Sequence, residues 1–336
     1  MTHTYKKKAY LILLIVLSIN FLQCNRGNAT FPETIVVNTE LPGLFLNGKQ
    51  FHAETFGNPA NPTIIVVHGG PGWDYQSVLP LAALGDEYFV VFYDQSGCGL
   101  SPRYAKEEIS LSSSLQDLDA FVNEFNHGQR VNLIGHSFGA MLVSAYIGLH
   151  PDKVAYSVLA EPPYLKPSNI DSLYSGPIKN GIISSYPLTN TIETEKQHKK
   201  ADLAFLLATQ SDDFNAEGMV CDASTFTGIP CQRPGALASS KLIEEFYSPE
   251  KGYFQDFTIG NNRFKNTILL LFGDCDSHFN PGYQRNIKSS LKKAYIMNVP
   301  NAGHFLFTDN PEACNLYIRN YFKNTDMIGS NKTFSF

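Results

Sequence analysis

The sequence lacks the features that mark several classes of protein. Its 336 residues contain no long basic stripe, no internal repeat and no low-complexity tract. The 26 Lys and Arg residues are outnumbered by 31 Asp and Glu residues, which gives a formal net charge of −5. Because nucleic-acid binding needs a concentrated positive surface, this balance argues against a nucleic-acid partner. With 43% hydrophobic and 17% charged residues, the composition excludes disorder and predicts a folded globular protein.

The main apolar run is too short for a comfortable membrane span. It extends from Ala9 to Leu22, follows three lysines and is broken only by Ser18 and Asn20. This size and flank predict a signal peptide or lipoprotein anchor over residues 1–24. Phe21-Leu22-Gln23-Cys24 is a loose match to the bacterial lipobox, so lipidation of Cys24, an uncleaved anchor and ordinary cleavage all stay open. We therefore expect export to a periplasmic or cell-envelope location, with a membrane tether through the N-terminus as one outcome.

The cysteine spacing does not fit a structural zinc site, because the sequence has no C-x₂-C pair with matching histidines. We accordingly expect no metal and no cofactor. An exported protein can form disulfides. Cys221 and Cys231 bracket a step rich in Gly, Pro, Ser and Thr, which predicts a disulfide between them, with two unpaired thiols as the alternative. The sequence leaves the oligomeric state open.

Hydrophobic periodicity predicts short strands that alternate with helices, hence an α/β fold with a mostly parallel sheet. Leu44–Phe56 forms two extended stretches around Asn47-Gly48, a strong hairpin signal. The β-branched runs that predict buried strands are Thr63–Val67, Tyr88–Tyr93, Val131–Ile134, Val154–Ala160, Thr267–Phe272 and Ala294–Val299. The amphipathic segments that predict helices are Leu111–Phe125, Phe138–Leu149 and Pro311–Phe322.

This alternation is interrupted once. Between Glu161 and Asn266 there is no continuous strand signal, prolines recur, and Ala201–Thr209 predicts a short helix. About one hundred residues do not form a plain loop in a compact domain. We therefore predict an inserted helical cap, or lid, over residues 161–264, with the α/β core comprising residues 35–160 and 265–324.

A candidate nucleophile lies between a predicted strand and a predicted helix. Gly135-His136-Ser137-Phe138-Gly139 fits the G-x-S-x-G pattern of a nucleophile elbow. The two glycines let the strand and the helix approach closely, and Ser137 is expected to have a strained backbone. An ordinary helix N-cap is the alternative interpretation of Ser137.

A serine hydroxyl needs a base to take its proton and a carboxylate to hold that base. His304 is the candidate base, since it is the only histidine after the last predicted strand. Asp276, three residues after Gly273 at the end of a strand, is the favoured acid. Asp274 competes with it, and Glu161 is a further alternative as well as a tentative substrate contact.

An oxyanion hole needs two backbone N–H donors. Phe138, directly after the candidate nucleophile, supplies one of them. Gly70, in the loop His68-Gly69-Gly70-Pro71-Gly72, is the candidate for the other. Trp73 follows this loop and is a tentative substrate contact. The alternative is that the loop is only a structural turn.

These blocks together resemble α/β-hydrolases of the proline iminopeptidase (prolyl aminopeptidase) type. The resemblance rests on the H-G-G-P-G loop, on Asp94-Gln95-Ser96-Gly97-Cys98-Gly99, on the elbow at Ser137, and on Asp276 and His304. It covers about residues 45–160 and 265–322.

The resemblance implies an α/β-hydrolase fold: a mostly parallel eight-stranded sheet, helices on both faces and an inserted helical cap. It implies a triad of Ser137, Asp276 and His304, and it implies that Asp94 and Cys98 belong to a structural loop. This sequence departs from the family pattern in two places. Ser96 stands where members usually carry Arg, and His136 and Phe138 flank Ser137 where members usually carry Gly and Trp.

The sequence thus predicts a serine hydrolase that forms an acyl-enzyme on Ser137. The favoured activity is an aminopeptidase that releases N-terminal proline or a small apolar residue from short peptides. A carboxylesterase or amidase on small acyl substrates is one alternative, and a catalytically inactive binding protein on the same fold is another. Ser rather than Asp at the elbow argues against haloalkane or epoxide chemistry. A peptidase of this kind would grip the substrate ammonium with carboxylates of the cap. The candidates are Asp171, Glu193, Glu195, Asp212, Asp213, Glu217 and Asp222.

Overall fold

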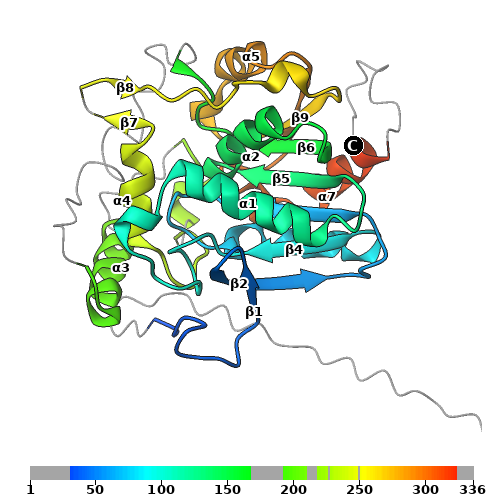
Figure 1. Ribbon diagram of the computed structural model, residues 1–336. Helices are drawn as coiled ribbons and strands as arrows, with labels where there is room; N and C mark the ends of the chain where they lie inside the picture. The colour runs from blue at the N-terminus through cyan, green and yellow to red at the C-terminus, as the bar shows by residue number, and fades with distance from the viewer. Residues whose placement is uncertain (1–30, 168–191, 210–217, 226–227, 249, 324–336) are drawn as a thin grey trace, which may run out of the picture.

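A computed structural model describes residues 31–167, 192–209, 218–225, 228–248 and 250–323 (Figure 1). The predicted signal peptide or anchor, including Cys24, lies outside these residues and stays a prediction. Over the part of the chain that is described, no helix combines the length and the apolar character needed to cross a membrane.

Eight strands form one sheet in the order β1-β2-β4-β3-β5-β6-β9-β10. The pairs β1/β2 and β2/β4 are antiparallel, and the remaining neighbours are parallel, which confirms the predicted mostly parallel sheet. The central strands β3, β4 and β5 are buried along their whole length, because helices cover both faces of a parallel sheet. The strands are β1 Gly43–Leu46, β2 Lys49–Phe56, β3 Thr63–Val67, β4 Phe89–Tyr93, β5 Val131–His136, β6 Val154–Ala160, β9 Ile268–Gly273 and β10 Ala294–Val299.

The predicted hairpin is present at the antiparallel edge of the sheet. Asn47 and Gly48 connect β1 to β2 with φ angles of 49° and 80°. A two-residue turn with both residues in the left-handed region suits the twist of the flanking strands, which explains the Asn-Gly pair.

Helices cover the sheet on both faces. One face packs on α1 (Leu111–Phe125), α2 (Phe138–Leu149) and α5 (Pro281–Ser289). The other packs on the 3₁₀ helix η1 (Tyr75–Asp86) and on α6 (Leu306–Asp309) and α7 (Pro311–Phe322). The ranges of α1, α2 and α7 are those predicted from periodicity.

The helix α5 was not predicted, although the sequence carries a signal for its start. Asn280 caps the helix by accepting hydrogen bonds from the N–H groups of Gly282 and Tyr283, and Pro281 occupies the first turn. An Asn followed by Pro is a recognised helix start. The segment is short and its apolar face is small, so periodicity alone did not identify it.

The segment between β6 and β9 carries short elements, and α3 and α4 lie beside one end of the strands (Figure 1). Gly235, directly before α4, donates its N–H to the carbonyl of Gly72 over 2.7 Å, so α4 begins against the loop that follows β3. The division of the chain into a core and a cap over residues 161–264 stays a prediction. The elements are α3 Glu195–Thr209, η5 Ala223–Thr225, α4 Ala236–Glu244, the strand pair β7 Tyr247–Ser248 and β8 Gly252–Tyr253, and η6 Asn261–Arg263. The two short 3₁₀ helices elsewhere are η2 Lys106–Glu108 and η7 Ser277–Phe279.

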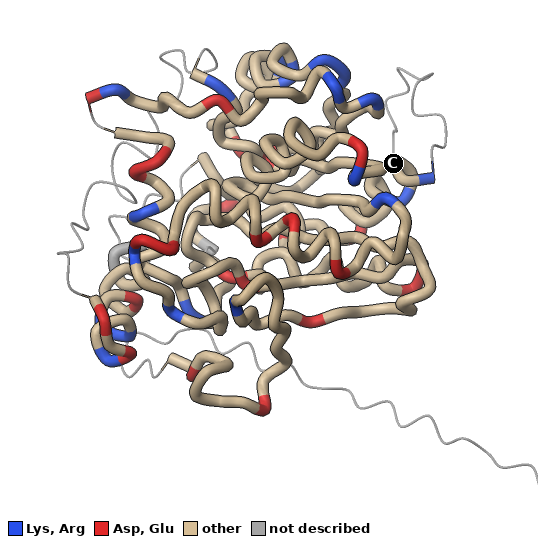
Figure 2. Tube along the Cα trace, viewed as in Figure 1, with Lys and Arg blue, Asp and Glu red and all other residues tan. Residues whose placement is uncertain are grey.

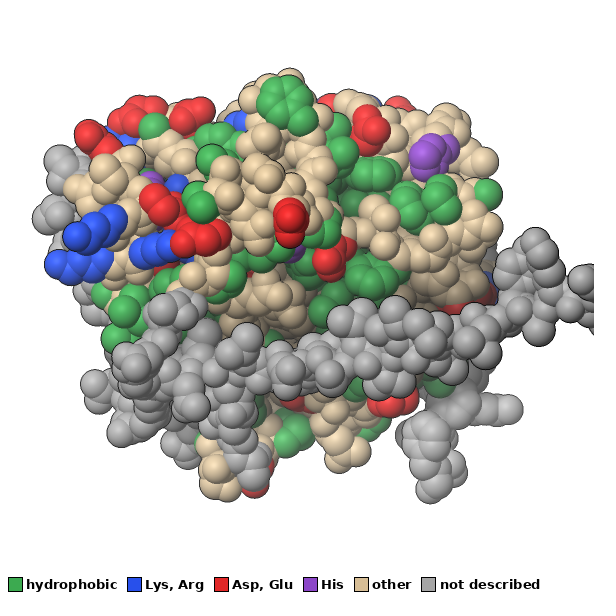
Figure 3. All heavy atoms as spheres, turned by 90° about the horizontal axis from the view of Figure 1, so that it is seen from below, with side chains coloured by type: hydrophobic (Ala, Val, Ile, Leu, Met, Phe, Trp, Pro, Cys, Tyr) green, Lys and Arg blue, Asp and Glu red, His purple; other side chains and the backbone are tan. Residues whose placement is uncertain are grey.

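Charged residues of both signs occur together on the described elements. Figure 2 shows Lys and Arg beside Asp and Glu on α3. On the face seen from below in Figure 3, basic side chains at one end lie next to acidic ones. The ion pair between Lys199 of α3 and Glu33 is one example of this interleaving.

Candidate active site

Ser137 stands on a sharp turn between β5 and α2, in the strained conformation expected of a nucleophile elbow. Its φ and ψ angles are 53° and −121°. A non-glycine residue in this region costs of order 1–3 kcal/mol, so the surrounding structure must impose it. Ser137 makes no side-chain cap hydrogen bond to α2, which weakens the interpretation of this serine as an ordinary N-cap.

The two glycines of the motif have no room for a side chain. A Cβ added at Gly139 would lie 2.1 Å from the carbonyl oxygen of Val67, and one at Gly135 would lie 2.4 Å from the carbonyl oxygen of Gly139. Both distances are far below van der Waals contact. The strand and helix therefore approach each other as closely as the elbow requires.

His304 reaches the Ser137 hydroxyl from the loop after β10. Its Nε2 lies 3.2 Å from the Ser137 Oγ. The backbone of His304 is fixed on both sides, since its N–H donates to the carbonyl of Met219 over 2.7 Å and its carbonyl accepts from Nε2 of His136 over 2.7 Å. The imidazole ring also stacks on Phe279. His304 is thus positioned by groups from three distant segments.

His136 acts in this arrangement as a neutral hydrogen-bond donor. Burial, with a smaller contribution from the charge of His304, lowers the pKa of His136 to about 3. At neutral pH its imidazole therefore carries one proton. Because Nε2 faces the His304 carbonyl, the proton resides on that nitrogen.

Asp276 lies on the other side of the base. Its Oδ2 is 3.5 Å from Nδ1 of His304, and its Oδ1 accepts the backbone N–H of His278 over 3.0 Å. Burial alone would raise the pKa of Asp276, but its hydrogen bonds and charge interactions with His278 and His304 outweigh burial and lower it. Asp276 is therefore the ionised carboxylate at neutral pH. Its competitor Asp274 is exposed, and its backbone N–H bonds to Val299.

Glu161 brings a second carboxyl to the same nitrogen. It follows β6 with a φ of 48°, is fully buried, and accepts the backbone N–H of Gly273 through Oε1. Its Oε2 lies 3.9 Å from Nδ1 of His304 and has no hydrogen-bond partner among the described residues. Burial, followed by the negative charge of Asp276, raises the pKa of Glu161 well above its usual range. The two carboxyls beside the base thus have opposite pKa shifts.

The three groups Glu161, Asp276 and His304 also have the residue types and spacing of a metal site. The arrangement is better explained without an ion, because His304 places one nitrogen toward Ser137 and the other toward the carboxyls. This orientation matches that of a base which lies between a serine hydroxyl and a carboxyl group.

The glycine-rich loop after β3 lies directly beside Ser137. A Cβ added at Gly69 would lie 3.0 Å from the Cβ of Ser137, and Gly70 has a φ of 131°. His68 holds the loop in place, since its Nε2 accepts the N–H of Gln95 and its carbonyl accepts the side-chain amide of Gln95. The candidate donors Gly70 and Phe138 therefore belong to rigid segments next to the hydroxyl.

The Asp94 loop, which follows β4, is held by hydrogen bonds of its own. The Asp94 carboxylate accepts hydrogen bonds from the N–H groups of Tyr75 and Leu100 and lies 2.8 Å from Nδ1 of His52. Cys98 in the same loop is fully buried. These contacts agree with the expected structural role of Asp94 and Cys98.

Trp73 and Phe305 belong to an apolar cluster beside the candidate site. Trp73 follows the glycine-rich loop, Phe305 follows the base, and both are buried. The Trp73 ring packs against Phe205 of α3 with centroids 5.6 Å apart. The structure therefore places Trp73 between the loop and α3.

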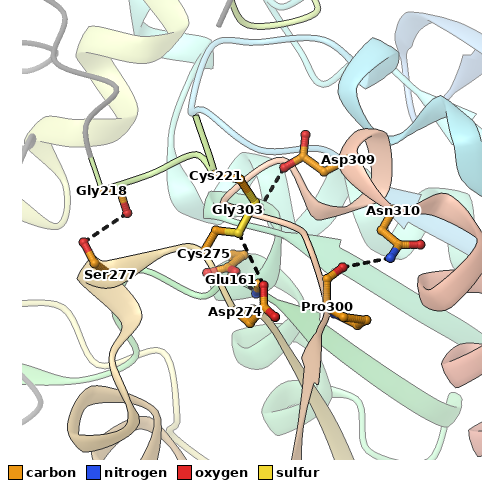
Figure 4. Close-up of a disulfide and its surroundings, with 11 residues drawn as sticks. Glu161, Gly218, Cys221, Asp274, Cys275, Ser277, Pro300, Gly303, Asp309 and Asn310 are labelled. Atoms are coloured by element: carbon orange, nitrogen blue, oxygen red, sulfur yellow. Dashed lines mark hydrogen bonds between the residues drawn. A yellow bond between two sulfur atoms is a disulfide. The ribbon is translucent and has the colours of Figure 1, made fainter. Parts of the chain in front are cut away.

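The expected disulfide between Cys221 and Cys231 is wrong. Cys221 is bonded instead to Cys275, 54 residues away and directly before Asp276 (Figure 4). The prediction relied on closeness in sequence. The fold brings residues 218–221 onto the loop after β9, and sequence spacing holds no information about that contact.

The carboxylates expected to bind a substrate ammonium group fall into three sets: one forms an ion pair, two are exposed, and four lie outside the described residues. Glu195 bonds to the buried Arg233 over 2.7 Å. Glu193 and Asp222 are exposed. Asp171, Asp212, Asp213 and Glu217 lie outside the described residues.

One buried carboxylate in this region was not predicted. Asp202 is fully buried and shared by two guanidinium groups, with Arg233 Nε at 3.0 Å and Arg103 Nη2 at 3.2 Å from its Oδ2. Its Oδ1 accepts the N–H of Ala236 at the start of α4. This cluster joins α3 and α4 to the chain after β4. The position of Asp202 on a helix with mixed charges gave no signal for burial.

Comparison with known proteins agrees with this fold. A family model described as alpha/beta hydrolase fold matches residues 62–311. A proline iminopeptidase of Heyndrickxia coagulans is 35% identical over 111 residues, which are 31% of this chain and 36% of that protein. The match thus spans about a third of the iminopeptidase's own length.

Two further matches cover most of the chain at lower identity. Epoxide hydrolase 3 of Xenopus tropicalis is 24% identical over 315 residues, covering 85% of this chain and 78% of that protein. The crystal structure of a proline iminopeptidase-related protein from Thermus thermophilus superimposes with a TM-score of 0.59 at 18% identity, covering 84% of this chain and 96% of that one. At this identity the structural likeness shows the fold alone.

Proposed function

Because the chain belongs to the α/β hydrolase family, we propose that it is a serine hydrolase with Ser137 as nucleophile, His304 as base and Asp276 as acid. The observation that carries this proposal is the 3.2 Å approach of His304 Nε2 to the hydroxyl of a serine in a strained elbow. Neither the strain nor the approach is needed for a residue that only caps a helix.

The geometry supports an acyl-transfer cycle. Nε2 of His304 takes the proton from Ser137 as its oxygen attacks the substrate carbonyl. The imidazolium that forms is stabilised by the ionised Asp276 at Nδ1. The N–H groups of Gly70 and Phe138 donate hydrogen bonds to the carbonyl oxygen and stabilise the negative charge that develops on it.

The first half of the cycle ends when the tetrahedral intermediate collapses. His304 gives its proton to the leaving group, which departs and leaves an ester on Ser137. In the second half of the cycle a water molecule attacks this ester while His304 accepts its proton. The bond between Ser137 and the acyl group then breaks, His304 returns the proton to the Ser137 oxygen, and the acid product leaves. The distance of 3.5 Å between Asp276 and His304 is compatible with this role, since such contacts tighten when the base becomes charged.

For the substrate, we propose an amino-terminal proline or small apolar residue of a short peptide. Support comes from the glycine-rich loop and from the relatives named proline iminopeptidase. Trp73 and Phe305 add an apolar surface next to the base and the oxyanion loop, which suits a proline ring.

An esterase or amidase on small acyl substrates is the second candidate, and the ion pairs favour it. A peptidase of this type needs a carboxylate free to bind an ammonium group. Among the described residues, however, Glu195 and Asp202 are both engaged in ion pairs, since Arg233 contacts both carboxylates and Arg103 also contacts Asp202. A substrate ammonium group that approached either carboxylate would also approach the positive guanidinium group of Arg233, which repels it.

A panel of chromogenic substrates separates these candidates. We expect proline and alanine naphthylamides to be hydrolysed by the wild-type protein and not by Ser137→Ala, with both proteins melting at nearly the same temperature. Hydrolysis of short-chain nitrophenyl esters without any aminoacyl-naphthylamide turnover would reject the peptidase proposal. A folded wild-type protein that hydrolyses neither class would instead favour a binding protein on this fold.

We also propose that the protein works outside the cytoplasm. The basic and apolar segment of residues 1–24 supports export. The Cys221–Cys275 disulfide supports an oxidising compartment. Cell fractionation with an antibody tests the location, and recovery of the protein only in the cytoplasm would contradict it.

A further inference from the structure

A short stretch of the β6–β9 segment is attached to the two loops that carry the base and the acid. We call residues Gly218–Cys221 the strap. Its last residue, Cys221, is bonded to Cys275, and the Cα atoms of the two cysteines are 4.8 Å apart. Figure 4 shows the disulfide between the strap and the loop after β9, with Gly303 of the base loop close by.

The strap also accepts two backbone hydrogen bonds from these loops. The carbonyl of Gly218 accepts the N–H of Ser277, directly after the acid, over 2.7 Å. The carbonyl of Met219 accepts the N–H of His304, the base itself, over 2.7 Å. Consecutive carbonyls of one segment thus hold the loops of both residues that activate Ser137.

The contact between the strap and the base loop is very close. A Cβ added at Gly303 would lie 2.2 Å from the carbonyl oxygen of Met219. Gly303 in turn donates its N–H to Asp309 over 2.8 Å, so the base loop is held from a second side (Figure 4). Glycine at 303 is therefore required for the strap to lie where it does.

The acid loop and the base loop also contact each other directly, beside the disulfide. Cys275 donates its N–H to the carbonyl of Ala302 over 2.9 Å. The covalent bond at Cys221 thus fixes the strap at the place where both loops meet. Cys221 is exposed and Cys275 is half-buried, so a reductant in solution can reach the bond.

We propose that the Cys221–Cys275 disulfide positions the base and the acid of the proposed hydrolase, so that its reduction slows acylation of Ser137. The proposal rests on the proposed function. The distance of 3.2 Å from His304 to Ser137 is already at the long end of the hydrogen-bond range, and the 3.5 Å from His304 Nδ1 to Asp276 Oδ2 is beyond it. A shift of the base loop by about 1 Å would therefore reduce the rate by up to roughly 100-fold.

The redox step needs a dithiol such as dithiothreitol. One thiolate of the dithiol attacks a sulfur of the disulfide, and its second thiol resolves the mixed disulfide. The S–S bond of the protein breaks, two protein thiols form, and the dithiol leaves as a cyclic disulfide. Two electrons and two protons pass from the reagent to the protein.

The first test uses hydrogen–deuterium exchange on the full-length wild-type protein, oxidised and reduced, with opening of the bond verified by alkylation and mass. We expect peptides that contain Ser277 or His304 to exchange about tenfold faster after reduction, while peptides of α1 exchange at an unchanged rate. Equal exchange in the two states at both loops would overturn the proposal. This readout does not depend on activity.

The second test compares variants by kinetics. Cys221→Ser with Cys275→Ser should lower kcat roughly 10- to 100-fold with little change in KM, and reduced wild-type protein should behave in the same way. Cys231→Ser is the matched control: it should match oxidised wild-type protein when oxidised, and it should lose kcat to the same extent as wild-type protein when reduced, because it keeps the Cys221–Cys275 disulfide. A double variant or reduced enzyme with wild-type kcat would contradict the positioning role.

The two tests also separate this proposal from the proposed function. If the oxidised wild-type protein shows no turnover and no labelling of Ser137 by a fluorophosphonate, the hydrolase proposal fails. The exchange experiment then still decides whether the disulfide orders the two loops. If the double variant does not fold, reduction of the wild-type protein supplies the same comparison.

Discussion

Replacement of the two carboxyls beside the base, one at a time, tests which of them serves as the acid. The distances alone do not decide, since Oδ2 of Asp276 and Oε2 of Glu161 lie 3.5 and 3.9 Å from the same nitrogen of His304. Protonation does decide. The pKa of Asp276 is lowered, whereas burial and the charge of Asp276 raise the pKa of Glu161, so Asp276 carries the charge at neutral pH.

The expected loss follows from the charge that stabilises the imidazolium. Two unit charges about 3.5 Å apart, at an effective dielectric constant of about 20, attract each other by about 5 kcal/mol. Asp276→Asn should therefore lower kcat/KM by roughly 10³- to 10⁴-fold, in line with the loss of about 10⁴-fold known for this change in a serine protease triad. Glu161→Gln should lower it less than about tenfold, because Gln keeps the acceptor for the Gly273 N–H and adds no charge.

The assay is kcat/KM for the best substrate of the panel between pH 5 and 9. Burial is the first cause of the raised pKa of Glu161 and the charge of Asp276 the second, so loss of that charge lowers the pKa of Glu161 part of the way toward its usual value. Residual activity of Asp276→Asn should then rise with pH, and the double variant with Glu161→Gln should lose this rise. If Glu161→Gln alone is as inactive as Asp276→Asn, the assignment of the acid is refuted.

Three changes affect stability and are measured by thermal or urea unfolding. In the folded state the pKa of Glu161 is raised. The contribution of Glu161 to the free energy of unfolding is therefore complete below its unfolded pKa of about 4.5 and declines as pH rises toward the folded value. Glu161→Gln should remove this decline, and an identical pH profile for the two proteins would contradict it. Gly139→Ala forces a Cβ to within 2.1 Å of a carbonyl oxygen and should lower the free energy of unfolding by about 3 kcal/mol or more. In the control Gly128→Ala the new Cβ meets nothing within 4 Å, so the loss should be only the roughly 1 kcal/mol due to the positive φ. Equal losses in the two variants would show that the elbow tolerates a side chain. Asp202→Asn leaves two buried guanidinium groups without their shared charge and should cost about 3–5 kcal/mol, so a loss below about 1 kcal/mol would contradict its role.

The parts of the fold that sequence predicts well are those set by local pattern. Periodicity and caps give α1 and α7, where Ser110 and Asn310 accept backbone N–H groups of the first turn. The motif around Ser137 predicts both the turn and its strain. Fold class follows because uniform apolar runs such as Thr63–Val67 can only be buried between two helical layers.

The features that sequence did not predict depend on contacts between distant segments. Cys98, Cys231, Cys275 and Cys314 are all possible partners of Cys221 in sequence terms, and only the position of the loop after β9 selects Cys275. The sequence leaves Glu161 open as an alternative to Asp276, but the approach of both carboxyls to the same nitrogen of His304 depends on the neighbouring positions of β6, β9 and β10 in the sheet. The carbonyl of Met219 that holds His304 carries no side-chain signal at all.

The central claim is that Ser137, His304 and Asp276 form a working nucleophile, base and acid. The most direct test is the rate of covalent labelling by a fluorophosphonate, followed by intact mass and peptide mapping. We expect one adduct on Ser137 of the wild-type protein, and labelling at least about 100-fold slower in His304→Ala. A folded wild-type protein that forms no adduct on Ser137, or a His304→Ala variant labelled at the wild-type rate, would contradict it.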